Sequence, residues 1–197
     1  MILLFTHICK YLLNKSENFS NERLFQDATD RFNYRGKNCP KCRALGRLMS
    51  YGGYFRRLIS RKEDEITDSL IYTLRFKCKS CNSTHALLPD VLIPYSRYSL
   101  RFKLLALIAY FERKTTVVNI CESFNIAVST LYEWKKQLLL HKDLLIGLLL
   151  SQKTTGLDFI RTFLNTESTP NPLERFFNKH GFSFLRKRGL ATHTVPP

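Results

Sequence analysis

Two short cysteine pairs are the residues of this chain whose types and spacing could do chemistry. Cys39 and Cys42 lie in the segment CPKC, and Cys78 and Cys81 lie in the segment CKSC. A Cys-x-x-Cys step lets two thiolates of one tight turn point at one tetrahedral metal ion, about 2.3 Å from each sulfur. One pair supplies half of a coordination sphere, and the second pair completes it. We therefore expect these four cysteines to hold one structural zinc ion.

Other uses of the cysteines are weaker. Disulfides require an oxidising compartment, and we find no convincing export signal, so we expect a cytoplasmic protein. A dithiol redox site opens a helix within a βαβ unit, and no such pattern surrounds the first pair. Four thiolates leave no open position for a catalytic water, so we expect no catalytic residues. We expect His85 to be a hydrogen-bonding structural histidine, and Cys9 and Cys121 to be small apolar fillers in helices.

The 35 residues between the two pairs must bring them together. They are enough for a small antiparallel sheet, so residues 31–94 are predicted to form a zinc ribbon. Within it, Gly52 and Gly53 predict a turn or bulge of a hairpin. Further along, the sequence predicts an acidic turn over 63–69, a strand over 70–77, a last short strand over 82–86, and an extended linker marked by Pro89 and Pro94.

The charge of the chain favours a polyanionic partner. Lys and Arg number 31 against 16 Asp and Glu, a formal net charge of +15. Residues 31–62 hold ten Lys or Arg and no acidic residue. Double-stranded DNA is the partner we expect, and an anionic membrane surface is the weaker alternative. Arg56 and Arg57 are candidate phosphate contacts, although a solvated edge strand explains them equally well.

The second half of the sequence is helical. Residues 99–113 predict an amphipathic helix that Ser99 caps. A short helix over 117–124 follows, with Thr115 or Thr116 as its cap. Asn125 occupies a turn position that needs a positive φ. A further helix from Ser129 to Leu140 is predicted, with Ser129 as its cap and Ile126 and Val128 filling the turn. Its buried stripe is predicted to contain Leu131, Trp134 or Lys135, and Leu138.

Two helices joined by such a short turn predict a helix-turn-helix over 95–142, with an ordinary αα-hairpin as the alternative. The exposed face of the second helix would then contact DNA. Hydroxyl groups can donate to phosphates, a carboxylate can accept from cytosine, and a lysine can meet a phosphate or guanine. The predicted DNA-contacting residues of this helix are Ser129, Thr130, Tyr132, Glu133 and Lys136.

The two ends of the chain carry fewer signals. Residues 1–30 are predicted to be a docking segment that begins with a strand or helix, because the initial apolar run is too short to span a bilayer. Residues 143–197 predict short helices, with a break near 153–156, and a basic end. The basic residues of this end are Arg175, Lys179, Arg186, Lys187 and Arg188. The fold class expected for the chain is α+β: a small antiparallel zinc ribbon with four cysteine ligands, followed by an all-α helix-turn-helix domain.

Several segments together resemble a family of uncharacterised bacterial proteins that carry a domain of unknown function and are associated with mobile elements. The resemblance rests on CPKC, YGGYFRR, RFKCKSCNSTHALLPDVLIPYSRYS, the helix-turn-helix and GFSFLRKRGLATHTVPP, roughly residues 35–190. It implies a zinc ribbon and DNA binding, and it implies no established activity. This chain has Asn125 where a glycine is more usual.

The function expected from these patterns is sequence-specific DNA binding without catalysis, in an accessory or regulatory role linked to a transposon or insertion element. A separate transposase is a candidate protein partner. One alternative is a fragment or subunit of a DNA transposase or recombinase, which would need carboxylates that converge on metal ions. The other is an RNA-binding or adaptor zinc-ribbon protein.

Overall fold

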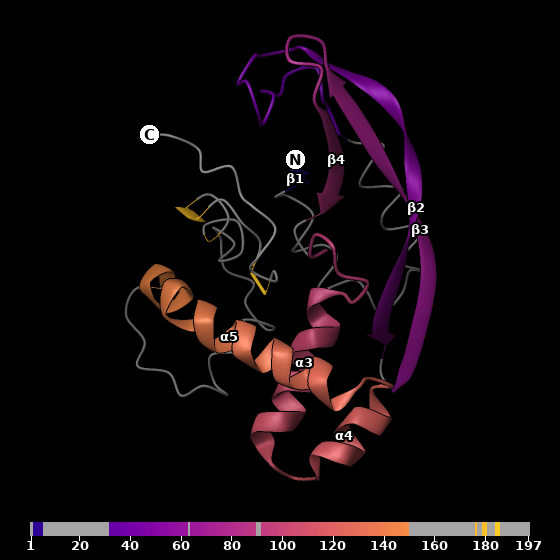
Figure 1. Ribbon diagram of the computed structural model, residues 1–197, viewed down its shortest axis with the longest axis vertical. Helices are drawn as coiled ribbons and strands as arrows, with labels where there is room; N and C mark the ends of the chain where they lie inside the picture. Colours follow the sequence, from indigo (N-terminus) through magenta and orange to yellow (C-terminus); the bar gives the residue numbers. More distant parts are fainter. Residues whose placement is uncertain are drawn as a thin grey trace. The chain divides into compact units, whose positions relative to one another are not determined.

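The computed structural model describes residues 2–5, 32–62, 64–89 and 92–149, together with Phe176, Lys179, His180, Phe184 and Leu185. The chain divides into two compact units, one up to Arg97 and one from Tyr98 onward. The described part of the first unit is a β-sheet with its loops, and that of the second is helical (Figure 1). The predicted α+β class is therefore confirmed.

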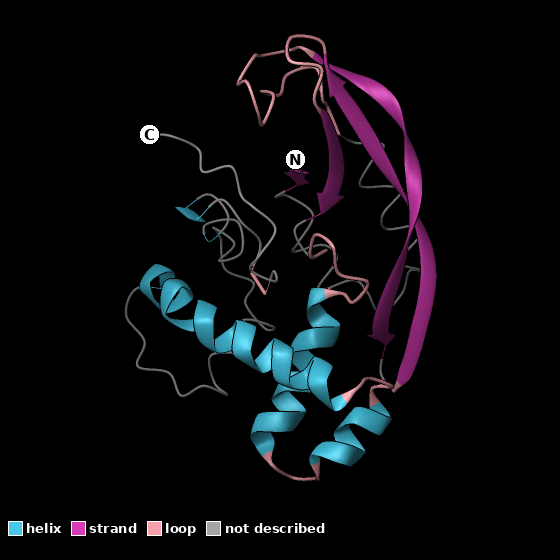
Figure 2. Cartoon of the chain, in the orientation of Figure 1, coloured by secondary structure: helices cyan, strands magenta, loops and turns pink. Residues whose placement is uncertain are grey.

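The sheet of the first unit has four strands in the order β1-β4-β3-β2 (Figure 2). They are β1 (Ile2–Phe5), β2 (Leu48–Lys62), β3 (Glu65–Cys78) and β4 (Thr84–Pro89). β3 pairs antiparallel with both β2 and β4, whereas β1 runs parallel to β4. The start of the chain thus contributes a strand, and β2, which holds four of the basic residues, is an edge of the sheet.

Two loop predictions in this unit are wrong. Residues 63–69 were expected to form an acidic turn, but Glu65–Ser69 belong to β3, where Ser60 and Thr67 hydroxyls lie 2.8 Å apart across the hairpin. Ile66 and Thr67 are β-branched, a residue type that favours strands. The HALLP segment was assigned partly to a linker, but β4 extends to Pro89, and Leu87 and Leu88 are buried.

Gly52 and Gly53 form a β-bulge within β2, one of the two predicted alternatives. The pairing of β2 with β3 shifts between Ser50, opposite Phe76, and Gly53, opposite Leu74. Gly52 has a φ of 63°, which glycine adopts readily. At Gly53 an added Cβ would lie 2.6 Å from the carbonyl oxygen of Thr73, so no larger residue fits without a backbone shift.

The sheet buries a different apolar cluster on each of its faces. The cluster nearest the cysteines contains Cys39, Leu48, Phe76, Cys78 and Leu87, with Phe32 and Tyr34 against it. The ring centroids of Tyr34 and Phe76 lie 4.9 Å apart. The second cluster contains Leu58, Ile71, Leu88 and Leu92. Because neighbouring residues of a strand face opposite sides, Leu87 and Leu88 serve different clusters.

The helical unit contains α3 (Leu100–Glu112), α4 (Val117–Ser123) and α5 (Val128–Leu149). Ser99 and Thr116 cap the first two, each accepting a hydrogen bond from the backbone N–H three residues later. One aromatic group joins all three helices: Phe102 packs against Phe124 and Trp134, with ring centroids 5.4 and 6.2 Å away.

α5 differs from the prediction at both ends. It begins one residue before Ser129, and the backbone N–H of Leu131 bonds to the carbonyl of Ala127, which makes Ala127 the capping position. Val128 is 41% exposed and does not fill the turn. At the other end α5 continues to Leu149, so a boundary after residue 142 would cut a continuous helix.

Other predictions lie outside the described residues: the segment 6–31 with Cys9, the break near 153–156, and most of the basic end, namely Arg175, Arg186, Lys187 and Arg188. Within the described part of the chain, no helix is both long and apolar enough to cross a membrane.

Candidate metal centre and candidate nucleic-acid interface

The two cysteine pairs lie on two turns that fold in the same way. In the first turn the N–H of Arg43 bonds to the carbonyl of Cys39, and in the second the N–H of Asn82 bonds to that of Cys78. Arg43 and Asn82 both have a positive φ, of 64° and 56°. In both turns the N–H of the first cysteine also bonds to the carbonyl five residues later. A left-handed residue four positions after the first cysteine thus closes each turn.

The sheet brings these turns together. Cys78 is the last residue of β3 and pairs with Leu48, the first residue of β2, so the second turn lies beside the end of the first. The N–H of Lys79 donates to the carbonyl of Arg47 across this junction, at 2.8 Å.

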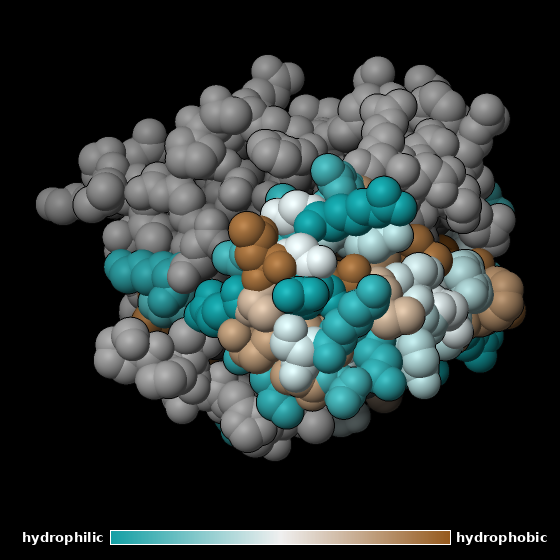
Figure 3. Space-filling view, turned by 90° about the horizontal axis from the view of Figure 1, so that it is seen from above, coloured by the Kyte–Doolittle hydropathy of each residue, from teal (hydrophilic) through white to brown (hydrophobic). Residues whose placement is uncertain are grey.

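Seen from above, the described surface is mainly hydrophilic, with apolar residues in separate patches (Figure 3).

The four predicted ligands converge. Each sulfur of Cys39, Cys42, Cys78 and Cys81 lies within 4.8 Å of the others. Cys39 and Cys81 are 3.7 Å apart, and Cys42 and Cys78 are 3.6 Å apart. A metal ion about 2.3 Å from four tetrahedral sulfurs requires sulfurs about 3.8 Å apart. These separations fit that tetrahedron and are far longer than a disulfide bond. The cluster is compatible with a metal ion such as zinc.

His85 lies beside the cluster without joining it. Its Nε2 is 3.4 Å from the sulfur of Cys39, within hydrogen-bond distance, and its ring is 1% exposed. Burial, helped by the charge of Lys41, lowers the pKa of His85 to about 4. A neutral imidazole can still donate one N–H to a thiolate, and such second-layer contacts orient metal ligands. His85 is therefore placed as the structural histidine that the sequence predicts.

The surroundings of Cys81 favour its metal-binding form. Hydrogen bonds from the side chain and backbone of Ser83 lower the pKa of Cys81 to about 6. Only the thiolate binds a metal ion, so a lower pKa reduces the free energy needed to remove the proton.

The turn between α4 and α5 is the second predicted site. The N–H of Ile126 bonds to the carbonyl of Cys121, and the N–H of Asn125 bonds to that of Glu122. This pair of bonds ends α4 in a Schellman motif, which needs a left-handed residue between the helices. Asn125 supplies it with a φ of 47°, as predicted. Cys121 and Ile126 are buried beneath the turn.

The predicted DNA-contacting residues of α5 are not equally accessible. Ser129, Tyr132 and Lys136 are exposed, and Thr130 is half-buried. Glu133 accepts a hydrogen bond from Gln137 at 3.1 Å and attracts the buried Lys103 of α3. Its carboxylate is therefore engaged within the helical unit, and we do not retain it as a base-contacting group.

Lys135 was predicted only as an alternative to Trp134 in the buried stripe, but Trp134 is the buried residue and Lys135 lies at this surface. Its Nζ donates to the hydroxyl of Tyr110 at 2.7 Å and lies 5.8 Å from the ring centre of Tyr132. Lys135 therefore lies between the rings of Tyr110 and Tyr132. One pocket on this surface is lined by Tyr132, Lys135, Lys136, Leu139 and Leu140. The sequence gives no local signal for the contact between Lys135 and Tyr110, because these residues lie 25 positions apart on two different helices.

The two arginines predicted to contact phosphate differ in their surroundings. Arg56 donates to the backbone carbonyls of Ile93 and Ser96, and burial lowers the pKa of its guanidinium. It fastens the segment after β4 to the sheet, so we do not retain it as a phosphate contact. Arg57 forms an ion pair with Asp68 at 2.6 Å, but its side chain is 63% exposed. Exposed pairs of this kind contribute little and can exchange partners.

These observations define a class: an α+β protein whose sheet carries a four-cysteine cluster and whose helical unit presents an exposed helix after a tight turn. Residues 29–134, more than half of the chain, match the family described as a domain of unknown function, DUF6431, and the chain belongs to this family. No curated protein matches the chain. No solved structure matches it either.

Proposed function

We propose that the four cysteines hold one structural zinc ion and that residues 31–94 form a zinc ribbon. The two turns with matching hydrogen bonds, and sulfurs spaced for a tetrahedron, support this proposal. Four thiolates complete the coordination of zinc, so the ion would fasten the ends of β2 and β3 rather than activate water.

The zinc proposal is tested with Cys78→Ser, which removes one ligand. We expect the wild-type chain to contain one zinc per chain by metal analysis and the variant to lose zinc and unfold its sheet. Cys121→Ser is the matched control, because Cys121 lies in the helical unit. It should keep its zinc. A wild-type chain with well under one zinc would contradict the proposal.

We propose further that the protein binds double-stranded DNA through a helix-turn-helix formed by α4 and α5. The observation that carries this proposal is the exposed beginning of α5 after the Schellman turn, where Ser129, Tyr132 and Lys136 lie on one side of the helix. Their positions repeat at three and four residues, so one groove of DNA could meet all three. The net charge of +15 and the exposed Arg57 would add phosphate contacts.

The experiment compares Lys136→Ala with Lys142→Ala on duplex DNA, by fluorescence anisotropy at fixed salt. The two lysines lie six residues apart on α5, about 240° around its axis, and both variants remove the same charge. We expect Lys136→Ala to weaken binding about 5- to 100-fold. The Lys142 variant should stay close to wild type. Equal effects of the two variants would show that α5 binds DNA by charge alone or not at all.

A role beside a transposase or in gene regulation follows from the family resemblance and is proposed on that basis. The alternatives are a catalytic fragment of a transposase or recombinase and an RNA-binding or adaptor protein. Assays of plasmid nicking and strand transfer with Mg²⁺ test for a catalytic fragment: activity that one carboxylate substitution abolishes would establish this alternative. Competition between structured RNA and duplex DNA for the protein tests for RNA binding.

A further inference from the structure

The bulge at Gly52 and Gly53 places two tyrosines on the same face of the sheet. Neighbouring residues of a regular strand alternate between faces, so Tyr51 and Tyr54, three positions apart, would lie on opposite faces. The bulge inserts one extra residue of β2 opposite β3, and the alternation of side chains shifts by one position. Tyr51 and Tyr54 are thereby brought to the same face. The ring of Tyr51 consequently faces Arg75 and Lys77 of β3, while Tyr54 and Arg75 line one pocket.

Both tyrosine rings are available to a ligand. Tyr51 is 49% exposed and Tyr54 is 40% exposed, large fractions for aromatic residues in a sheet. Their positions correspond to neighbouring same-face sites of β3, about 7 Å apart along the strand. The two rings therefore form a short row along β2, spaced for two successive planar groups.

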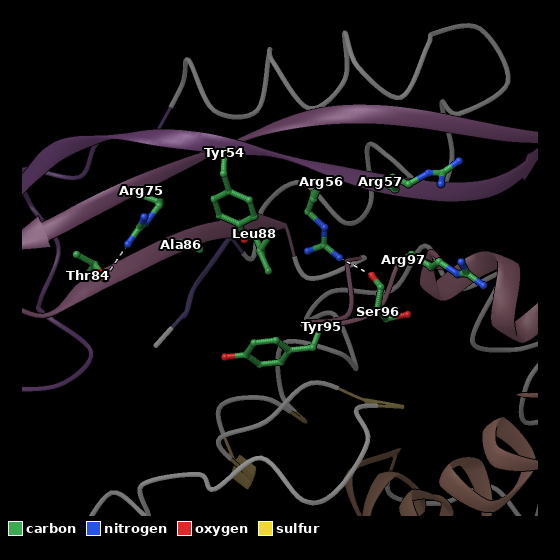
Figure 4. Close-up of a pocket in the computed structure, with 10 residues that line it drawn as sticks. All are labelled: Tyr54, Arg56, Arg57, Arg75, Thr84, Ala86, Leu88, Tyr95, Ser96 and Arg97. Carbon is green, nitrogen blue, oxygen red and sulfur yellow. Dashed lines mark hydrogen bonds between the residues drawn. The ribbon is translucent and has the colours of Figure 1, made fainter.

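Cations accompany this row. The guanidinium carbon of Arg75 lies 5.7 Å from the centre of the Tyr51 ring, and the Nζ of Lys77 lies 5.5 Å from it. Arg75 is held in place because it donates to the hydroxyl of Thr84 at 3.1 Å. Next to Tyr54, a pocket of about 450 Å³ opens (Figure 4). Its lining includes Tyr54, Arg56, Arg75, Thr84, Ala86 and Leu88.

Negative charge lies elsewhere in the described part of this unit. Its acidic residues there are Asp64, Glu65 and Asp68, all at the far end of the β2–β3 hairpin. Asp64 pairs with Arg61, and Asp68 pairs with Arg57. The cations beside Tyr51 therefore have no described carboxylate beside them, and the surface is complementary to an anion that also carries flat rings.

We propose that this tyrosine row, defined as Tyr51 and Tyr54 with Arg75 and Lys77, binds single-stranded nucleic acid. Single strands are held by aromatic rings on which successive bases stack, next to cations that follow the phosphates. Duplex DNA hides the faces of its bases and so could not use the rings. An acidic peptide could pair with the cations but offers no row of flat groups. The site is separate from α5 and adds a second kind of ligand to the proposed duplex binding.

The test measures binding of a fluorescent oligothymidylate of about 15 nucleotides by anisotropy, with the full-length, zinc-loaded protein. The double variant Tyr51→Leu/Tyr54→Leu removes the rings and keeps apolar side chains, whereas Tyr51→Phe/Tyr54→Phe keeps the rings. Phe55→Leu is the matched control: Phe55 is 68% exposed, adjacent to Tyr54, and on the opposite face of β2.

We expect the leucine double variant to bind the oligonucleotide about tenfold or more weakly. The phenylalanine double variant and Phe55→Leu should bind within about twofold of wild type, and circular dichroism and zinc content should be unchanged in all three. Binding of duplex DNA should not change in the leucine variant, which separates this proposal from that for α5.

Three results would overturn the proposal. They are no binding of oligothymidylate by the wild-type protein, an equal loss in Phe55→Leu, and an undiminished affinity of the leucine double variant. A wild-type protein that binds polyglutamate as tightly as oligothymidylate, with the same response to the variants, would also overturn it in favour of an acidic protein partner.

Discussion

At the scale of single residues, His85 is placed to support the proposed zinc site without being a ligand. Its Nε2 lies 3.4 Å from the sulfur of Cys39, and the ring is buried. Replacing His85 with Phe keeps a ring but removes the hydrogen bond. We expect zinc affinity to fall about 10- to 100-fold, because the thiolate loses the partner that orients it.

This prediction is measured by competition for zinc with a chromophoric chelator. His85→Gln, which keeps an N–H donor, is the matched control and should lie between wild type and the Phe variant. An affinity unchanged in His85→Phe would show that the histidine only fills space.

Lys103 of α3 provides a second test at this scale. It is 4% exposed, and burial lowers its pKa to about 8 although Glu133 opposes the shift. Its Nζ lies 5.4 Å from the centre of the Trp134 ring. Below pH 8 the folded and unfolded chains both carry the proton, and the cost of burying the charge is fully present. Between pH 8 and the ordinary value of 10.5, the unfolded chain binds more protons, so stability rises with pH.

Urea denaturation of the wild type and of Lys103→Met at about pH 8 and about pH 10 measures this effect. The free energy of unfolding of the wild type should rise relative to the variant by at most about 3 kcal/mol. Groups common to both proteins cancel in the comparison. Parallel pH dependences in the two proteins would mean that Lys103 is solvated in solution.

At the scale of elements, the turn between α4 and α5 depends on one left-handed residue. Asn125 has a φ of 47°, and its N–H and that of Ile126 close the Schellman motif. Asn125→Val places a β-branched residue in this conformation and should lower the free energy of unfolding by roughly 1–2 kcal/mol. Asn125→Gly should leave it equal or slightly higher. Thermal unfolding followed by circular dichroism distinguishes the two, and equal midpoints would argue against the turn.

Local patterns in the sequence predicted those features that local physics decides. Ser99 and Thr116 are caps, Asn125 has a positive φ, and the Gly52–Gly53 segment is a bulge. The four cysteines were predicted from spacing alone, and they do converge. In each case the residue type and its nearest neighbours in the chain allow few other conformations or roles.

Features that depend on distant partners were predicted poorly. The acids at 63–69 suggested a turn, but a paired strand across the hairpin makes Glu65–Ser69 a strand as well. Arg56 looked like a phosphate contact, yet its carbonyl partners come from the segment after β4. Glu133 was predicted to face DNA, but its carboxylate interacts with Gln137 and Lys103. The sequence shows which residues are charged, whereas the fold shows which partners they have.

At the scale of the whole molecule, the chain joins two units of different charge. The described part of the sheet unit has 13 Lys or Arg against three acidic residues, and the described residues 98–149 have seven against four. The sheet unit therefore supplies most of the described positive charge, while the helical unit presents the helix proposed to contact bases. A basic sheet could hold phosphates or single strands while α5 meets a duplex.

The salt dependence of binding to duplex DNA tests the central proposal most directly. Zinc-loaded wild-type protein is titrated with one duplex at several salt concentrations, and the logarithm of the association constant is plotted against that of the salt concentration. We predict a straight line with a slope of about −3 or steeper, because each lysine or arginine that meets a phosphate releases counterions. Binding that does not change between low and physiological salt, or no binding at low salt, would contradict the proposal that this protein binds DNA.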